Sequence, residues 1–309
     1  MNPRAMTLAA MLMTATIACN PPASAPTTPP ASQQKPEADA ALTDTKPTPG
    51  AEAPPANDAV IYKDDKGRTL TMADLQDAQE LADDRWDQNI APEAMSSYQA
   101  GQLAGRERRF DDAITHFLDA SLAAPGWPKP IYGAAWTYLF QGDVEKSLEA
   151  YEAVDKIAPR GYIATKAAID TLKREQDAKL PPASYLRFEL QLAKRDKDGR
   201  IVFLKEILAE SPNFPVAWKE LSTLLDDPDE SLAAIEKGLT FQPDDDTRGH
   251  LLVNKAIHLM RLDRRDEAIE ILGKLALDRK STNATEFMAK VTLMRLHGGT
   301  FRQNTPQTP

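Results

Sequence analysis

The sequence has few of the residues that usually carry chemistry. Its 309 residues include a single cysteine, Cys19, so no internal disulfide can form. It has only four histidines, and none stands at the cysteine or carboxylate spacing that completes a metal site. A glycine-rich phosphate loop and a Gly-x-Ser-x-Gly nucleophile motif are also missing. These absences predict a protein that is not an enzyme and that needs no metal or cofactor.

Basic residues are outnumbered, with 37 lysines and arginines against 46 aspartates and glutamates, a formal net charge of −9. Nucleic-acid binding normally needs a basic surface, so we expect no nucleic-acid partner. Three basic clusters nevertheless fall at turns between predicted helices. These cations either stabilise helix ends or form an edge that faces anionic lipid or an acidic partner. They are Arg106, Arg108 and Arg109; Lys194, Arg195 and Lys197; and Arg261, Arg264 and Arg265.

Two consecutive blocks of 34 residues end at Pro125 and Pro159 and share one pattern. Apolar and small residues precede each proline at the same distances: Ala113, Phe117 and Ala120 in the first block, Ser147, Tyr151 and Val154 in the second. A spacing of four and then three residues places them on one face of an α-helix. In the second block Gly142 interrupts the pattern and separates this helix from an earlier one. Each block therefore predicts a helix, a tight turn and a second helix.

This pattern resembles the tetratricopeptide repeat, whose period and late alanine, aromatic and proline positions agree with both blocks. The resemblance implies an all-α protein, a right-handed α-solenoid of stacked helix-turn-helix repeats over residues 94–299. A later unit begins at Trp218, which stands where the family has its characteristic tryptophan and should therefore be core. Residues 160–212 fit the pattern poorly, so we expect an irregular bend there.

By the same resemblance, one face of the first helices should form a groove for protein or peptide partners. Aromatic side chains with polar neighbours suit such a groove, because they give a large contact area at a low entropy cost. The alternative is that Trp136 and Phe140 only pack against the neighbouring repeat or the N-terminal cap. The candidate groove residues are Tyr98, Gln102, Arg106, Tyr132, Trp136, Leu139, Phe140, Lys166 and Asp170.

Residues 1–18 have the features of a secretory signal peptide, with Arg4 before an apolar run that ends at Ala18. The following Cys19 resembles the lipidated cysteine of bacterial lipoproteins, although Thr16 replaces the usual leucine. This resemblance implies a lipid anchor at Cys19 in the bacterial cell envelope. The outer membrane is favoured over the inner because Asn20 is not aspartate. The alternative is ordinary cleavage after Ala25, which would remove Cys19.

The remaining segments flank the repeats. Residues 19–57 hold ten of the 24 prolines, and we expect them to form a disordered linker. Residues 58–93 predict an N-terminal cap: a hairpin with its turn at Gly67, then a helix that Thr71 caps, packed against the first repeat. Residues 300–309 should be a disordered tail.

These features together predict a non-catalytic scaffold that is anchored to a membrane and binds protein or peptide partners in the periplasm. A second hypothesis is an accessory regulator of peptidoglycan or envelope-assembly enzymes that reaches across the periplasm through the linker.

Overall fold

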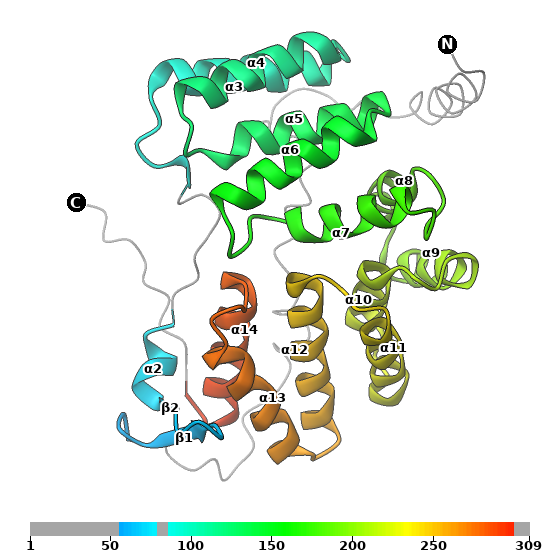
Figure 1. Cartoon of the computed structure of the whole chain (residues 1–309). Coiled ribbons are helices and arrows are strands. Elements are labelled where there is room, and N and C mark those ends of the chain that lie inside the picture. The colour runs from blue at the N-terminus through cyan, green and yellow to red at the C-terminus, as the bar shows by residue number, and fades with distance from the viewer. Residues whose placement is uncertain (1–55, 79–85, 300–309) are drawn as a thin grey trace.

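A computed structural model describes residues 56–78 and 86–299. The predicted signal peptide, Cys19, the linker up to residue 55 and the tail lie outside these residues. The described chain is helical apart from one hairpin (Figure 1). Its elements are β1 (Val60–Lys63), β2 (Thr69–Thr71), α2 (Met72–Gln76), α3 (Pro92–Arg106), α4 (Phe110–Ala123), α5 (Pro128–Gln141), α6 (Val144–Ile157), α7 (Thr165–Gln176), α8 (Ser184–Leu192), α9 (Lys197–Glu210), α10 (Pro215–Leu224), α11 (Pro228–Thr240), α12 (Asp245–Arg261), α13 (Arg265–Leu277) and α14 (Asn283–Leu296).

The two founding blocks form the predicted helix pairs. Helix α3 packs against α4 and α5 against α6, while α4 also contacts α5 and so joins the pairs into a stack. Between α5 and α6 the chain turns at Gly142, whose φ of 79° lies in the left-handed region that glycine adopts without steric cost. The buried Ser147 hydroxyl donates to the Ala135 carbonyl at 2.9 Å and ties the second helix to the first. The predicted helical solenoid is thus confirmed.

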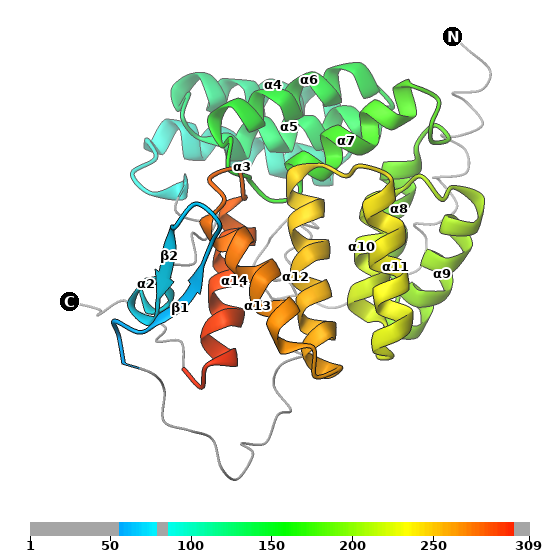
Figure 2. The same ribbon diagram turned by 60° about the horizontal axis from the view of Figure 1, so that its bottom comes forward.

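The stack changes direction in the region where the sequence pattern is weak. Figures 1 and 2 show α3–α6 lying across α10–α14, with α7, α8 and α9 at the bend. Helix α8 has only nine residues, and it follows Ala183, which has a left-handed φ of 63°. Buried side chains form four clusters along the stack, as expected when each repeat packs mainly on its neighbours.

Trp218 is less buried than the sequence predicts. Its side chain is only partly buried and packs on the outside of the core cluster that α7 to α11 share. Its indole N–H donates to the Pro212 carbonyl at 2.8 Å, and Phe214 is the fully buried aromatic residue of this unit. The indole therefore covers the turn before α10 rather than filling the centre of the repeat.

The N-terminal hairpin and helix have the predicted local structure. Strand β1 pairs with β2 in antiparallel fashion, and Gly67 occupies the turn with a φ of 78°. Thr71 caps α2 in a reciprocal capping box with Asp74, which satisfies two backbone N–H groups at the helix start. These features depend on residues close together in sequence.

The predicted position of this cap is wrong. The hairpin and α2 pack against α13 and α14, at the C-terminal end of the stack, and not against the first repeat (Figure 2). Tyr62, Leu70, Met72 and Leu75 join one core cluster with side chains of α12, α13 and α14. At the first repeat, Trp127 instead donates its indole N–H to Asp87 at 2.8 Å. An apolar face could cover either end, so only tertiary packing selects the C-terminal one.

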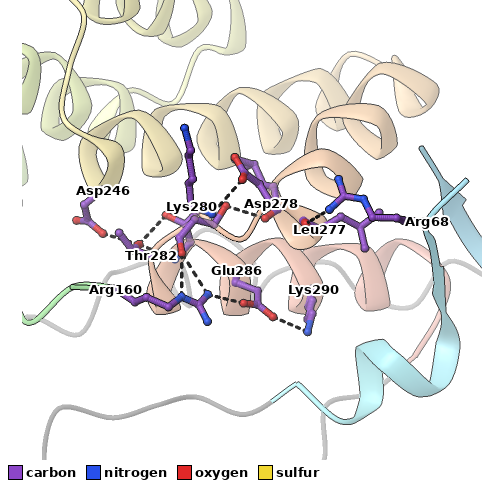
Figure 3. A network of polar contacts seen from close by, with 12 residues as sticks. Arg68, Arg160, Asp246, Leu277, Asp278, Lys280, Thr282, Glu286 and Lys290 are labelled. Atoms are coloured by element: carbon purple, nitrogen blue, oxygen red, sulfur yellow. Dashed lines mark hydrogen bonds and ion pairs between the residues drawn. The ribbon is translucent and has the colours of Figure 1, made fainter. Parts of the chain in front are cut away.

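A polar network joins the middle of the chain to its last repeat (Figure 3). Arg160, in the turn between α6 and α7, donates to the Ser281 carbonyl at 3.1 Å and pairs with Glu286 at 2.6 Å. The Asn283 backbone N–H in turn donates to the Arg160 carbonyl at 2.9 Å. Thr282, in the turn between α13 and α14, donates to Asp246 at 2.8 Å, which connects this turn to α12. These contacts hold α14 close to the first repeats, beyond the neighbour contacts usual in a solenoid.

Candidate functional site

Three of the nine predicted groove residues are core side chains. Tyr98, Tyr132 and Leu139 have exposed fractions of 8%, 9% and 2%. The Tyr98 ring lies 5.0 Å from that of Trp127, and the Tyr132 ring lies edge-on to that of Tyr151 at 5.6 Å. They present little surface to a partner, so the prediction that they line a groove is corrected. These three side chains belong to the core under the first helices of the repeats.

Three of the four polar residues in the predicted set have partners within the fold. The Gln102 amide donates to the Tyr98 hydroxyl at 2.9 Å. Lys166 pairs with Asp155 at 2.7 Å. Asp170 pairs with Arg174 at 2.8 Å. Arg106 is exposed at the C-terminal end of α3. These four side chains do not converge with one another on a single site.

The remaining two residues, Trp136 and Phe140, belong to a row of aromatic rings. Both are partly buried, and their ring centroids lie 5.8 Å apart on α5. Phe110 of α4 stacks on Phe140 at 6.3 Å, with an interplanar angle of 3°. Tyr185 of α8 contacts Trp136 at 5.9 Å. The row therefore crosses from α4 over α5 to α8, which is far away in sequence.

A carboxylate stands beside the end of this row. Glu189 follows Tyr185 by one helical turn on α8, so both lie on the same face of the helix. Burial, helped by the nearby Glu220 carboxylate, raises the pKa of Glu189 to about 7, although Lys219 acts in the opposite direction. Burial and then the Glu189 carboxylate raise the pKa of the Tyr185 hydroxyl well above its usual value. Glu189 is thus partly withdrawn from water and close to an aromatic ring.

Helix α10 adds an ion pair to this face. Lys219 and Glu220 are partly exposed, and the ammonium nitrogen lies 2.9 Å from a Glu220 carboxylate oxygen. Burial tends to raise the pKa of Glu220, but the Lys219 ammonium outweighs it and holds that pKa below its usual range. We call the continuous set from α4 to α10 the aromatic-acidic surface. It consists of Phe110, Phe140, Trp136, Tyr185, Glu189, Lys219 and Glu220.

Most of this surface escapes the sequence prediction. Trp136 and Phe140 are predicted from the repeat register, whereas Phe110, Tyr185, Glu189, Lys219 and Glu220 are not. The four-residue spacing of Tyr185 and Glu189 would place them on one helix face. Nothing in the sequence shows that this face meets Trp136, because α8 lies in the region where the register is lost.

A separate open pocket of about 340 Å³ lies near α7, between the loops that precede α10 and α12. The largely buried Arg174 guanidinium is one of its walls. It pairs with Asp170, donates to the Asn213 side chain and donates to the carbonyls of Phe241 and Gln242 at 2.9 and 3.0 Å. Because its donors are satisfied within the protein, we interpret Arg174 as a structural cross-link rather than a ligand-binding group.

One cation in each basic cluster at the helix turns forms an ion pair. Arg109 pairs with Glu107 and Asp112, at 2.7 and 2.5 Å. Lys197 pairs with Asp226 at 2.7 Å, and Arg264 pairs with Glu267 at 2.6 Å. One member of each cluster is therefore ion-paired, and these three cations stand at the start of α4, α9 and α13.

The two histidines of α12 are withdrawn from solvent. His258 is buried at 5% exposure, and burial, followed by Arg261, lowers its pKa. His250 is partly buried, with its Nδ1 atom 2.9 Å from the Asp246 backbone carbonyl oxygen. Residues 56–78 and 86–299 contain no group of three histidine, cysteine, aspartate or glutamate side chains that could hold a metal. None of the helices in these two ranges has the length and apolar character needed to cross a membrane.

Comparison with known proteins identifies the repeat. Residues 129–160, which span nearly all of α5 and all of α6, match the family model of the tetratricopeptide repeat. The chain is therefore a tetratricopeptide-repeat protein, a class of generally non-catalytic scaffolds for protein-protein interaction. No curated protein matches the sequence.

Several solved structures are weakly similar to the chain. MamA from Desulfovibrio magneticus RS-1 is 15% identical and covers 60% of this chain and 94% of its own, with a TM-score of 0.29. YrrB, described as a tetratricopeptide-repeat protein with an unusual peptide-binding site, is 14% identical over 69% of this chain and 100% of its own, with a TM-score of 0.29. TTC0263 from Thermus thermophilus is 18% identical over 64% and 99%, with a TM-score of 0.27. Scores this low carry no inference about a partner.

Proposed function

We propose that this protein is a non-catalytic scaffold of the bacterial envelope, anchored through a lipid on Cys19, that binds a segment of a partner protein on the aromatic-acidic surface. The observation that carries the binding role is the aromatic row on α4, α5 and α8. Phe110, Phe140 and Trp136 remain partly exposed although each contacts another ring of the row. Large rings that are held in place and still reach solvent offer contact area at little entropic cost.

The position of the cap is compatible with a tether. The described chain begins at residue 56, just before β1, and β1 packs on α13 at the C-terminal end of the stack. The aromatic-acidic surface belongs to α4, α5, α8 and α10 instead (Figure 1). A linker that enters at the cap therefore joins the body at a different set of helices from those that would bind the partner. Anchoring and binding can then occur together.

Partner capture from envelope extracts tests the binding role. Native protein should retain a specific partner, and Trp136→Ala should lose it while circular dichroism shows unchanged helicity. Phe140→Leu is a gentler second variant, because it keeps apolar volume but removes the stacked ring, and it should weaken capture several-fold.

Tyr138→Ala is the matched control, because Tyr138 lies on the same helix but packs toward the first repeat. It should leave the captured partner unchanged. Equal capture by native protein, Trp136→Ala and Phe140→Leu would rule out this surface as the binding site.

The anchor is tested by changing Cys19 to serine. Native protein should sediment with membranes and partition into detergent, because acyl chains on a cysteine hold a protein at a bilayer. Cys19→Ser should move to the soluble fraction. The mass of the mature N-terminus decides between the two cleavage sites: a chain that begins after Ala25 would have lost Cys19, and its location would not respond to the substitution.

A further inference from the structure

The carboxylate of Glu189 has no counter-ion of its own. It forms no ion pair within residues 56–78 and 86–299, and the cation that acts on it, Lys219, is bonded to Glu220 at 2.9 Å. The carboxylates of this site are Glu189, Glu220 and Asp246, and its cations are Lys219, Arg200 and, when protonated, His250. With the histidine neutral and the other groups ionised, an excess of one negative charge remains. A partly buried charge without a counter-ion is unfavourable, so this site gains most from a ligand that brings a positive group.

Tyr185 connects this carboxylate to the aromatic row. Trp136 is partly exposed and contacts Tyr185 at 5.9 Å, and Tyr185 lies one helical turn before Glu189. Tyr132 and Tyr151, whose rings meet edge-on at 5.6 Å, lie beneath them. The faces of tryptophan and tyrosine rings attract cations, most strongly where water is partly excluded. The rings and the carboxylate therefore favour the same kind of ligand.

The tyrosine hydroxyls on the inner side of this site are neutral. The side chains of Tyr151 and Tyr185 are fully buried, and both hydroxyls are close enough to Glu189 for its charge to raise their pKa, in addition to the larger effect of burial. The Tyr151 hydroxyl makes no hydrogen bond with any described residue. A neutral hydroxyl can orient its dipole toward a carboxylate but cannot cancel its charge. A compensating positive charge therefore has to come from outside, past the partly exposed Trp136.

We propose that Glu189 and Trp136, with the buried Tyr185 packed between their helices, form a subsite for a basic side chain of the bound partner segment, with arginine preferred to lysine. A guanidinium stacks on an aromatic face while its planar N–H groups reach a carboxylate, whereas an ammonium is a compact and more strongly hydrated charge. The subsite rests on the proposed function, because it specifies the chemistry of the segment bound on the aromatic-acidic surface. The α8 end of that surface would therefore bind a cationic side chain.

Peptide libraries on beads test this subsite with the full chain. Four libraries of random nine-residue peptides carry a fixed central arginine, lysine, glutamine or glutamate. The native protein should be retained about tenfold better by the arginine library than by the glutamine library, with lysine between them and glutamate lowest. Glu189→Gln should remove the preference for arginine but keep the retention on the glutamine library. Glu206→Gln makes the same charge change at an exposed position of α9 and should behave as native.

The outcomes separate this inference from the proposed function. If the native protein is retained by none of the four libraries, the binding role of the surface fails and the subsite fails with it. If the four are retained equally, or if Glu189→Gln keeps the preference for arginine, only the subsite is overturned. Trp136→Ala should weaken retention on all four libraries, because it removes contact area as well as the cation-binding face.

Thermal melts show whether Glu189→Gln is folded. The native pKa of Glu189, about 7, lies above its ordinary value of 4.5, so the folded state binds more protons than the unfolded state between these values. The stability that this group contributes is therefore present below pH 4.5 and lost as the pH rises through 7. Glutamine cannot ionise, so the variant should melt close to native protein at pH 5 and no lower than native at pH 8. A lost preference in a chain that melts this way reports binding and not unfolding.

Discussion

Replacing Arg174 by methionine should lower the free energy of unfolding by about 3–5 kcal/mol. This is the usual cost of removing one partner of a buried ion pair and leaving the other without its counter-charge. The Arg174 side chain is 10% exposed and joins Asp170 on α7 to Asn213 and to the carbonyls of Phe241 and Gln242. Methionine keeps the length but leaves these acceptors without their donors. Urea denaturation followed by circular dichroism measures the loss.

Two further arginine variants make this test specific. Arg174→Lys should recover only a small part of the loss, because an ammonium cannot reach all four acceptor groups as the guanidinium fork does. Arg187→Met is the matched control. Arg187 is 52% exposed, and its ion pair with Glu210 is long, at 3.3 Å, so its removal should lower the free energy of unfolding by less than about 1 kcal/mol. Equal denaturation midpoints for Arg174→Met and Arg187→Met would show that the bend is not held by Arg174.

Replacing Gly273 by alanine should displace the N-terminal cap and lower stability by about 2–3 kcal/mol. A Cβ atom at this position of α13 would lie 2.2–2.6 Å from three atoms of the Tyr62 ring. Since the contact is with the rigid ring near its attachment, the hairpin or the helix has to move. Hydrogen exchange should then rise in β1, β2 and α14, which this packing covers.

Gly105→Ala is the control for this prediction. Its added Cβ would lie 3.9 Å from the Ala113 side chain, an ordinary contact, so the variant should be neutral or slightly more stable. The double variant Tyr62→Ala with Gly273→Ala should show little extra loss over Tyr62→Ala alone, because the clash is gone. If exchange instead rose in α3 and α4, the cap would cover the first repeat, as the sequence alone suggests.

Features that depend on neighbouring residues can be predicted from the sequence. Gly142 and Gly67 adopt left-handed conformations where the pattern predicts turns, and Thr71 caps α2. The spacing before Pro125 and Pro159 predicts α4 and α6, together with the buried Phe117 and Tyr151. The prediction succeeds because capping, turn formation and helical periodicity act over at most a few turns of chain.

Contacts between distant segments were decided only by the tertiary structure. The cap covers α13 and α14, and Arg160 pairs with Glu286, although nothing in either local sequence specifies the partner. The same holds for the meeting of Trp136 with Tyr185, which brings Glu189 to the aromatic row. The sequence determines that this chain is a stack of helix pairs with an apolar cap, because those signals are periodic and local. The bend at α7–α9 decides which helices of the first repeats lie beside α8 and the later helices. The packing angle there depends on how side chains of distant helices fit together, and no regular repeat pattern specifies it.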